Sequence, residues 1–357
     1  MMLFVGRPPF YASHASHGFE SVTQFVSEYS LERKVSDVGS ATFSLKNITK
    51  RLINDFLFGG LMKTIYVYDD QTLLVWSGYI RAITINLTNI SISVSLDGLA
   101  TVIQIEYTDP FTNQTSTESY TDSAALADYG YITRTFSAGE KTAAEISALI
   151  SLLAFSRKSP DIAKVIQESD ETTIEIEAST FEGLLEFPYT GTGIYLPRST
   201  IVTNIIQSDP NASFNAGYIE YDSFEVLESE EETSGLAAIK DLMNIGYDID
   251  NKWIFYFQGK SFFFHTIKKK IEYVMRNGFV RDMGQRIVSP ARIQPGSLIF
   301  FPEFAEGYPL GSFDTDPRIG IIESVVISSD NPDKPDLTIG QFSTLRSQLN
   351  SLGLGGM

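Results

Sequence analysis

Three histidines are the side chains of this chain that could most readily act as bases or metal ligands: His14, His17 and His265. His14 and His17 are three residues apart, so a helix would place them on one face as a pair of ligands. No Asp or Glu follows them in a metal-site arrangement, and Pro9 and Gly18 indicate a loop. His265 alternates with a run of Phe, which is typical of a packed or edge residue in a strand. We therefore expect none of the three to be a metal ligand or a catalytic base.

Nucleophilic chemistry has little support in the sequence. A Ser-His-Asp triad would have to use one of these histidines, and the chain contains no G-x-S-x-G motif. Cysteine is absent, which excludes disulfides, thiolate nucleophiles and Cys-ligated metals. The pair Gly191 and Gly193 lacks the third glycine and the following helix of a phosphate-binding loop. The sequence therefore predicts no catalytic residue, no metal and no cofactor, and we expect the protein not to be an enzyme.

Carboxylates gather in two places. Asp248 and Asp250 resemble the opening of a calcium loop, but Trp253 stands where such a loop needs Gly, and the closing Glu is missing. A turn between two strands explains this pair better. The acidic run from Glu220 to Glu232 could collect a divalent ion or flank a glycosidic bond with two carboxylates. A solvated loop before a helix is the simpler interpretation of this run.

Aromatic residues are dense in the segment 253–264, and basic residues are frequent in the segment 268–292. The aromatic residues could form a platform on which a carbohydrate stacks. The simpler interpretation is that alternating Phe and Tyr fill both faces of a sheet that lies between a helix and another subunit. We predict an interface between subunits whose candidate residues are Trp253, Phe255, Phe257, Phe263, Lys268, Lys269 and Lys270.

Composition indicates a folded and acidic protein. The 357 residues suffice for two or three domains, and 43% of them are hydrophobic. No apolar run reaches the length of a transmembrane helix, and the first residues do not resemble a secretory signal. The formal net charge is −17, which disfavours neutralisation of DNA phosphates. An acidic surface can instead line a passage through which DNA slides without adhering.

Alternating apolar residues predict that the first segment, 1–107, is β-rich. Two strands are expected at 29–35 and 41–45, and a hairpin at 63–68 and 72–80. A further pair is expected at 83–87 and 90–96, where the alternation changes phase at Thr88 and Asn89. Such a change of phase indicates a tight turn or a bulge. Together these strands predict an antiparallel meander of β-barrel type.

The middle segment, 108–290, mixes helices and strands. Thr142 and Glu145 form a potential capping box before Ile146, Leu149, Ile150 and Leu153, which share one helix face. Helices are predicted only here, at 142–157, and at 235–245, where Ser234 is the expected cap. Strands are expected at 172–176 and 201–206, and a meander of three strands at 247–250, 253–257 and 261–267. A surface loop or hairpin is expected at 109–122.

The end of the chain returns to strands. They are expected at 293–301, 318–328 and 336–339, within a second barrel-like domain at 291–345, and the Gly-rich segment 346–357 is predicted to be a flexible tail. The predicted fold class is therefore mainly β (α+β), with two β-barrel-like domains around a middle α+β region.

The order of these elements resembles that of a known family. The stretches LLVWSGYIRAITIN, KTAAEISALISLLA, SGLAAIKDLMNIGYDIDNKWIFYFQGKSFFFHT and RIQPGSLIFF follow one another in the chain. This arrangement is similar to the hub proteins at the tail tip, or baseplate, of tailed bacteriophages and related contractile injection systems. The resemblance covers most of the chain and is one of pattern, without an invariant motif.

The resemblance implies a structural virion component that is made in the host cytoplasm. Its β-barrel domains would pack as a homotrimer into a pseudo-sixfold ring that connects the tail tube to the tip and lines the DNA exit channel. The implied partners are the neighbouring tail proteins (tail tube, distal tail ring, tip or fibre proteins) and DNA that passes without specific binding, with no insertion into a membrane. The resemblance supplies no catalytic residues. The alternative is a carbohydrate-binding or carbohydrate-active β protein that uses carboxylates and aromatic platforms.

Overall fold

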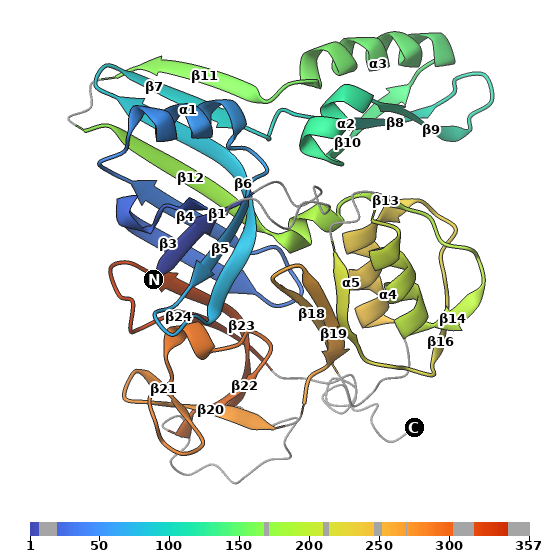
Figure 1. The fold of residues 1–357 in the computed structure, drawn as a ribbon. Helices are drawn as coiled ribbons and strands as arrows, with labels where there is room; N and C mark the ends of the chain where they lie inside the picture. Colours follow the sequence, from blue (N-terminus) through green and yellow to red (C-terminus); the bar gives the residue numbers. More distant parts are fainter. Residues whose placement is uncertain are drawn as a thin grey trace.

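A computed structural model describes residues 1–6, 20–167, 171–209, 214–245, 252–268, 270–302 and 318–341, and its fold is mainly β, as predicted (Figure 1). The helices are α1 (Lys50–Gly59), α2 (Ser123–Tyr129), α3 (Ala143–Arg157), α4 (Arg198–Gln207) and α5 (Gly235–Asn244). The strands up to α4 are β1 (Met2–Val5), β2 (Glu20–Ser21), β3 (Val26–Lys34), β4 (Ser40–Leu45), β5 (Thr64–Tyr68), β6 (Leu74–Leu87), β7 (Ile90–Ser95), β8 (Val102–Thr108), β9 (Thr115–Thr121), β10 (Thr133–Glu140), β11 (Asp161–Ile166), β12 (Thr173–Thr180), β13 (Pro188–Tyr189) and β14 (Tyr195–Pro197). The later strands are β15 (Asn215–Ile219), β16 (Glu225–Leu227), β17 (Thr233–Ser234), β18 (Trp253–Gln258), β19 (Ser261–Thr266), β20 (Ile271–Arg276), β21 (Phe279–Asp282), β22 (Leu298–Phe300), β23 (Ile319–Ser328) and β24 (Asp336–Gln341).

One curled sheet of 14 strands runs through the left side of Figure 1 and holds the largest core. Its main path follows the order β2-β1-β5-β6-β12-β4-β3-β23-β22-β20-β21, while β7, β11 and β24 branch from it. Strands from both ends of the chain meet in this sheet, because β23 pairs antiparallel with β3. Strand β12, from the middle of the chain, lies between β4 and β6.

The predicted hairpins of the first segment are present. The change of phase at Thr88 and Asn89 is a tight turn, since Leu87 pairs with Ile90 across it. Helix α1 was not predicted; it begins after Thr49 and packs Leu52 and Phe56 against the core. Leu52 and Phe56 are four residues apart and therefore lie on one helix face. This spacing indicates a helix, whereas the strand prediction for this segment looked for alternation with a period of two.

A lobe built on β8, β9 and β10 lies at the upper right of Figure 1. The predicted segment 109–122 is a hairpin turn with β9, and α2 after it was not predicted. Helix α3 has the predicted capping box, in which Thr142 Oγ1 accepts from the Glu145 amide and Glu145 accepts from the Thr142 amide. Its predicted face packs on the β8 sheet through the buried Ile146.

Helices α4 and α5 cover one face of a small sheet with the order β15-β19-β18. The strand expected at 201–206 is wrong, because this segment lies in α4. Its buried residues Ile201, Val202, Ile205 and Ile206 follow helical spacing, which the β-branched composition had obscured. Helix α5 has the predicted cap, Ser234, which accepts from the Ala237 amide. The strand expected at 247–250 lies outside the described residues.

The expected strands of the last segment are β22, β23 and β24, in one antiparallel arrangement. The hairpin of β20 and β21 within the basic segment was not predicted. The segment 346–357 lies outside the described residues. Among the described residues, no helix has both the length and the apolar character needed to cross a bilayer.

Candidate functional site

The predicted interface segment forms two strands whose side chains point to opposite faces. Trp253 and Phe255 lie on the inner face of β18, toward α4 and α5, where both are buried. Trp253 stacks on Phe264 with ring centroids 4.8 Å apart, and Phe255 stacks on Phe262 at 5.9 Å. Period-2 alternation places these residues together, and the helices then remove them from solvent. Two of the seven predicted interface residues are therefore part of the core of the chain itself.

Helix α4 supplies a cation to this inner face. The Arg198 guanidinium lies 4.7 Å from the Trp253 ring and is almost fully buried. Its Nη1 lies 3.5 Å from a carboxylate oxygen of Asp222, and its Nη2 donates to the Ile245 carbonyl. A buried Arg needs such partners to offset the loss of its hydration. The contacts fix α4, and with it the inner face of β18.

Phe257, at the end of the same face, is half-buried against other aromatic rings. Its ring centroid lies 4.7 Å from that of Phe214 and 6.4 Å from that of Phe181. Phe181 precedes the carboxylate Glu182, at the end of β12. Phe257 therefore joins the small sheet to the large one and serves the fold.

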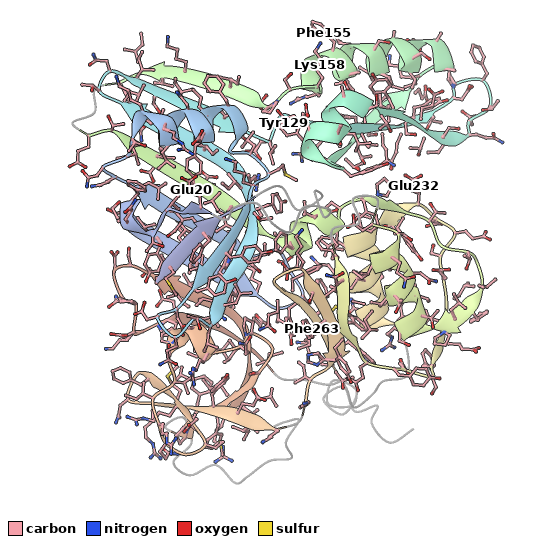
Figure 2. The ribbon with its side chains drawn as sticks, viewed as in Figure 1. Glu20, Tyr129, Phe155, Lys158, Glu232 and Phe263 are labelled. Atoms are coloured by element: carbon pink, nitrogen blue, oxygen red, sulfur yellow. The ribbon has the colours of Figure 1, made fainter. Side chains whose placement is uncertain are left out.

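The outer face of the small sheet carries four rings that the helices do not cover. We call this surface the aromatic face: Tyr218, Tyr256, Phe263 and His265. Tyr256 and Phe263 are a cross-strand pair whose rings are parallel within 5° and 5.1 Å apart. His265 meets Tyr256 edge-on at 5.8 Å and lies 6.4 Å from Tyr218. Figure 2 labels Phe263 on this sheet. Large rings that remain accessible on ordered strands are suited to contact another molecule.

Basic residues border the aromatic face. Lys268 and Lys270 are exposed and line a recess of about 230 Å³ together with Tyr256, His265 and Glu272. Burial, and secondarily Glu272, raises the pKa of Tyr256, so this phenol stays protonated at neutral pH. Lys269 lies outside the described residues. The structure thus brings together Phe263, Lys268 and Lys270, three of the predicted interface residues, on one outer surface.

The acidic run does not converge on a site. Glu220 accepts from the Thr266 amide at 2.8 Å, at the end of β19, whereas Glu232 accepts from Gln104 in the β8 lobe. Glu228 is buried and accepts from Tyr189 and Thr192. Burial acts to raise the pKa of Glu228, but these hydrogen bonds outweigh it and hold the pKa below its usual value. The run therefore holds several loops in place instead of collecting one ion.

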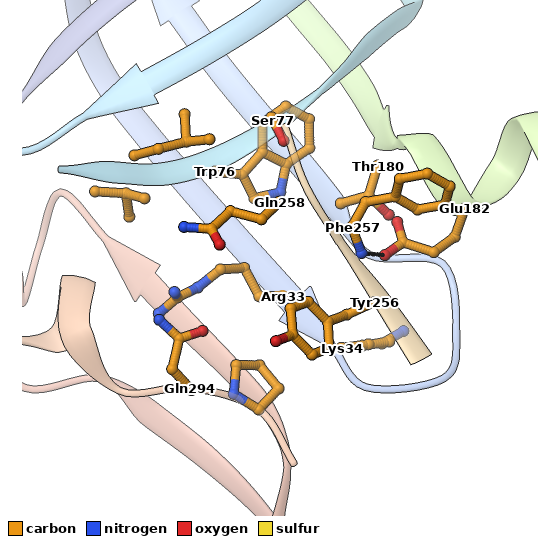
Figure 3. Close-up of a pocket in the computed structure, with 13 residues that line it drawn as sticks. Arg33, Lys34, Trp76, Ser77, Thr180, Glu182, Tyr256, Phe257, Gln258 and Gln294 are labelled. Atoms are coloured by element: carbon orange, nitrogen blue, oxygen red, sulfur yellow. Dashed lines mark hydrogen bonds between the residues drawn. The ribbon is translucent and has the colours of Figure 1, made fainter. Parts of the chain in front are cut away.

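A small polar recess lies where three parts of the chain meet (Figure 3). A recess of about 60 Å³ is lined by β3, β6, β18 and the turn at Gln294. Glu182 is 4% exposed and accepts from the Phe257 amide at 2.9 Å, and burial raises its pKa to about 7. Arg33 donates to the carbonyls of Pro290, Ala291 and Ile293, and burial lowers its pKa to about 10. A recess of this size has room for only a few waters, so we interpret it as a joint between segments.

The candidate catalytic and metal-binding residues do not come together within the part of the chain that the structure describes. No three His, Asp or Glu side chains gather there in a way that could hold a metal ion. His265 Nδ1 lies 2.8 Å from the Thr266 carbonyl oxygen. The His265 ring packs against Tyr218 and Tyr256, as expected of a strand residue. His14, His17, Asp248 and Asp250 lie outside the described residues.

Sequence reasoning missed three residues: Glu182 in the recess, Arg198 on the inner face of the small sheet and Tyr218 on the aromatic face. Glu182 stands between Phe181 and the run Gly183-Leu184-Leu185, and an isolated charge among such residues is a signal that could have marked it. Arg198 is followed by Ser199 and Thr200 and carries no such signal. Tyr218 joins the aromatic face because β15 pairs with β19 in parallel, with a bulge between Ala216 and Tyr218. Nothing in the local sequence specifies that pairing.

No protein-family model matches the sequence, and no curated protein sequence matches it.

Solved structures do resemble the fold. The tail protein from Neisseria meningitidis MC58 has a TM-score of 0.42 at 7% identity, over 95% of this chain and 95% of its own. The 43 kDa tail protein of prophage MuSo2 from Shewanella oneidensis has a TM-score of 0.41 at 8% identity, over 96% and 98%. An E. coli component of the type VI secretion system, described as structurally similar to T4 bacteriophage tail proteins, has a TM-score of 0.32 at 10% identity, over 88% and 72%.

Proposed function

We propose that this chain is a non-enzymatic structural component of a phage tail or related injection system, and acts as the hub at the tail tip. The observation that carries the proposal is that large apolar side chains stay exposed on well-formed helices and strands in several separate places, among them α3, β11 and the β14–β16 sheet. Contiguous uncovered apolar surface on ordered elements marks contacts with other proteins. The order of elements along the chain, similar to that of tail hubs, indicates which kind of assembly covers it.

In this proposal three copies form a closed ring between the tail tube and the tip. The barrel-like parts at 1–107 and 291–345 would surround the channel, and surfaces of the middle segment, 108–290, would join neighbouring copies. Phe263, Lys268 and Lys270 on the aromatic face are proposed to contact a neighbouring tail protein. Trp253, Phe255 and Phe257 would support that surface from within, because they pack beneath it.

The ring would enclose the exit channel for DNA. The net charge of −17 supports this role, since an acidic wall repels the phosphate backbone and lets DNA pass without adhering. Basic residues are expected at subunit or neighbour contacts, away from the lumen. A lumen lined by Lys and Arg would contradict the channel.

The experiment is a mass measurement of the purified chain, by sedimentation and native mass spectrometry, at micromolar concentration in low and moderate salt. We expect three times the 39.7 kDa of one chain, and a closed ring by electron microscopy. A strict monomer in both salts would contradict a ring that forms unaided. Saturable sugar binding by that monomer, lost in a Tyr218→Ala variant, would favour the carbohydrate-binding alternative.

The aromatic face is tested by co-purification with the neighbouring tail proteins. A Phe263→Ala and Lys268→Glu variant is expected to lose this association while the mass of the ring is unchanged. The matched control is Phe111→Ala with Lys334→Glu, which removes an exposed ring and a positive charge elsewhere. Equal loss in both variants would contradict the role given to the aromatic face.

A further inference from the structure

Helix α3 and strand β11 are consecutive elements, and both leave apolar side chains exposed. The two elements follow each other in sequence and lie along the upper edge of the molecule (Figures 1 and 2). On α3, Phe155 is 74% exposed and Leu152 is also exposed, although the opposite helix face packs on the β8 sheet. All six residues of β11 are exposed. We call this surface the α3–β11 face: Leu152, Phe155, Lys158, Ile162, Lys164 and Ile166.

One face of the large sheet is buried as far as β7 and exposed at β11. Ile83, Val94 and Ile162 occupy neighbouring positions across β6, β7 and β11, so they share one face of the sheet. The end of α1 lies over Ile83, whose side chain closely approaches Gly60. Val94 is 8% exposed, whereas Ile162 is 73% exposed. The outer edge of β11 is also free, because β7 is the one described strand that pairs with it. Such an edge accepts a strand from another chain.

The α3–β11 face is locally basic in an acidic protein. Residues 146–167 contain three Lys or Arg and a single acidic residue, Asp161. Lys158 and Lys164 are exposed, and Lys158 Nζ lies 4.9 Å from the centre of the Phe155 ring. Positive charge therefore sits directly beside the uncovered apolar side chains.

A second uncovered surface has the opposite charge. Strands β14 and β16 form a separate two-stranded sheet on the right side of Figure 1, and no other described strand pairs with either. Tyr195 and Leu227 are cross-strand neighbours on it, and Tyr195 is 65% exposed. Residues 199–239 contain eight Asp or Glu and no Lys or Arg. Glu225 and Glu230 are exposed beside the apolar pair. We call this surface the β14–β16 face: Ile194, Tyr195, Glu225, Leu227 and Glu230.

We propose that the α3–β11 face of one copy binds the β14–β16 face of a second copy, head to tail. Each face offers apolar side chains that a partner could bury and a strand edge with which a partner could pair. The α3–β11 face is basic and the β14–β16 face is acidic, so their charges attract each other. Contact between two identical faces would instead place like charges together. A head-to-tail contact between two different faces closes a ring when its rotation returns to the first copy, and extends into a filament when it does not. In the ring proposed above, the rotation closes after three copies. This inference rests on the proposed function and names the contact that builds its ring.

The absence of cysteine allows a clean test by cross-linking. Full-length Ile162→Cys and Leu227→Cys chains are made separately, mixed, and treated with a short bismaleimide. We expect the mixture to give about tenfold more covalent dimer than either variant alone, because one reactive face meets the other. Both positions are exposed, so the substitutions leave the fold intact. The control pairs Leu227→Cys with Phe111→Cys, a position that is at least as accessible as Ile162 but lies in the β8–β9 loop.

Charge reversal shows whether complementarity orders the contact. Adding Lys158→Glu and Lys164→Glu to the Ile162→Cys chain should lower the dimer yield about tenfold, and adding Glu225→Lys and Glu230→Lys to its Leu227→Cys partner should restore it. The proposal would be overturned if Ile162→Cys alone gave as much dimer as the mixture, or if the mixture gave no more dimer than the control pair. It would also be overturned if the charge reversals left the dimer yield unchanged.

The mass of the unmodified chain separates this inference from the proposed function. Cross-linking between residues 162 and 227 in an assembly of another size would support the contact and overturn the three-fold ring. A three-copy mass without this cross-link would support the ring and overturn the contact.

Discussion

Replacing Glu182 with Gln probes the joint between the large sheet and β18. The Glu182 carboxylate is buried, accepts from the Phe257 amide, and has a pKa that burial raises to about 7. The ordinary value is 4.5. Each unit of pKa difference between folded and unfolded states corresponds to about 1.4 kcal/mol. Ionising this group in the folded chain therefore costs about 3 kcal/mol more than ionising it in the unfolded chain.

The direction of the pH dependence follows from where the proton binds more tightly. Because the pKa is raised in the folded chain, the folded state holds the proton more tightly than the unfolded state. The stabilisation is fully present below pH 4.5 and is lost as the pH rises through about 7. The Glu182→Gln variant does not titrate, while its amide oxygen can still accept from Phe257.

The assay is urea denaturation of both chains at about pH 4 and about pH 8. Relative to the parent, the variant should gain about 3 kcal/mol in free energy of unfolding between the two values. Glu177→Gln, at an exposed position of β12 five residues before Glu182, is the matched control and should change by less than about 0.5 kcal/mol. The same variant-minus-parent difference at both pH values would refute the reasoning.

Three further predictions concern packing and capping. Phe255→Ala should lower the free energy of unfolding by about 3–5 kcal/mol, whereas Phe263→Ala on the outer face should cost less than half as much; equal losses in urea denaturation would contradict the assignment of the two faces. Thr142→Ala removes the capping box of α3 and should cost about 1 kcal/mol, with faster amide exchange confined to the first turn; unchanged exchange there would argue against the cap. Arg33→Met removes the donors to three carbonyls of the 290–293 turn and should cost about 2–3 kcal/mol, seen as a lower urea midpoint; an unchanged midpoint would show that the turn holds without Arg33.

The strands and the two capped helices could be predicted from sequence because their signals are local. Alternation specified β6 and β7, and the capping box specified α3 to within a residue at its start. Helix α4 could not be found in this way. Its β-branched residues have strand propensity, and the helix is stabilised by packing on β18 and α5, which are distant in sequence.

The candidate surfaces depended even more on tertiary structure. Alternation shows that Trp253 and Tyr256 point to opposite faces, but not which face α4 and α5 cover. The free edge of β11 is also a property of pairing, since β7 is the one strand among the described residues that pairs with it. Sequence reasoning could name a segment as an interface, and only the fold could separate its core residues from its accessible ones.

The pairing of β3 with β23 has a consequence for how the chain is made. Residues such as Leu31 and Ile327 are neighbours in the sheet although almost three hundred positions separate them in the chain. A ribosome therefore releases β3 and β4 long before the strand that completes their edge exists. Contacts of such high sequence separation slow folding, because the long intervening loop must close first. Until then the open edge of β3 is exposed to mispairing with other nascent chains. A product truncated before residue 319 would keep that edge permanently, so aggregation is its expected fate, and incomplete chains would be removed before they could enter an assembly.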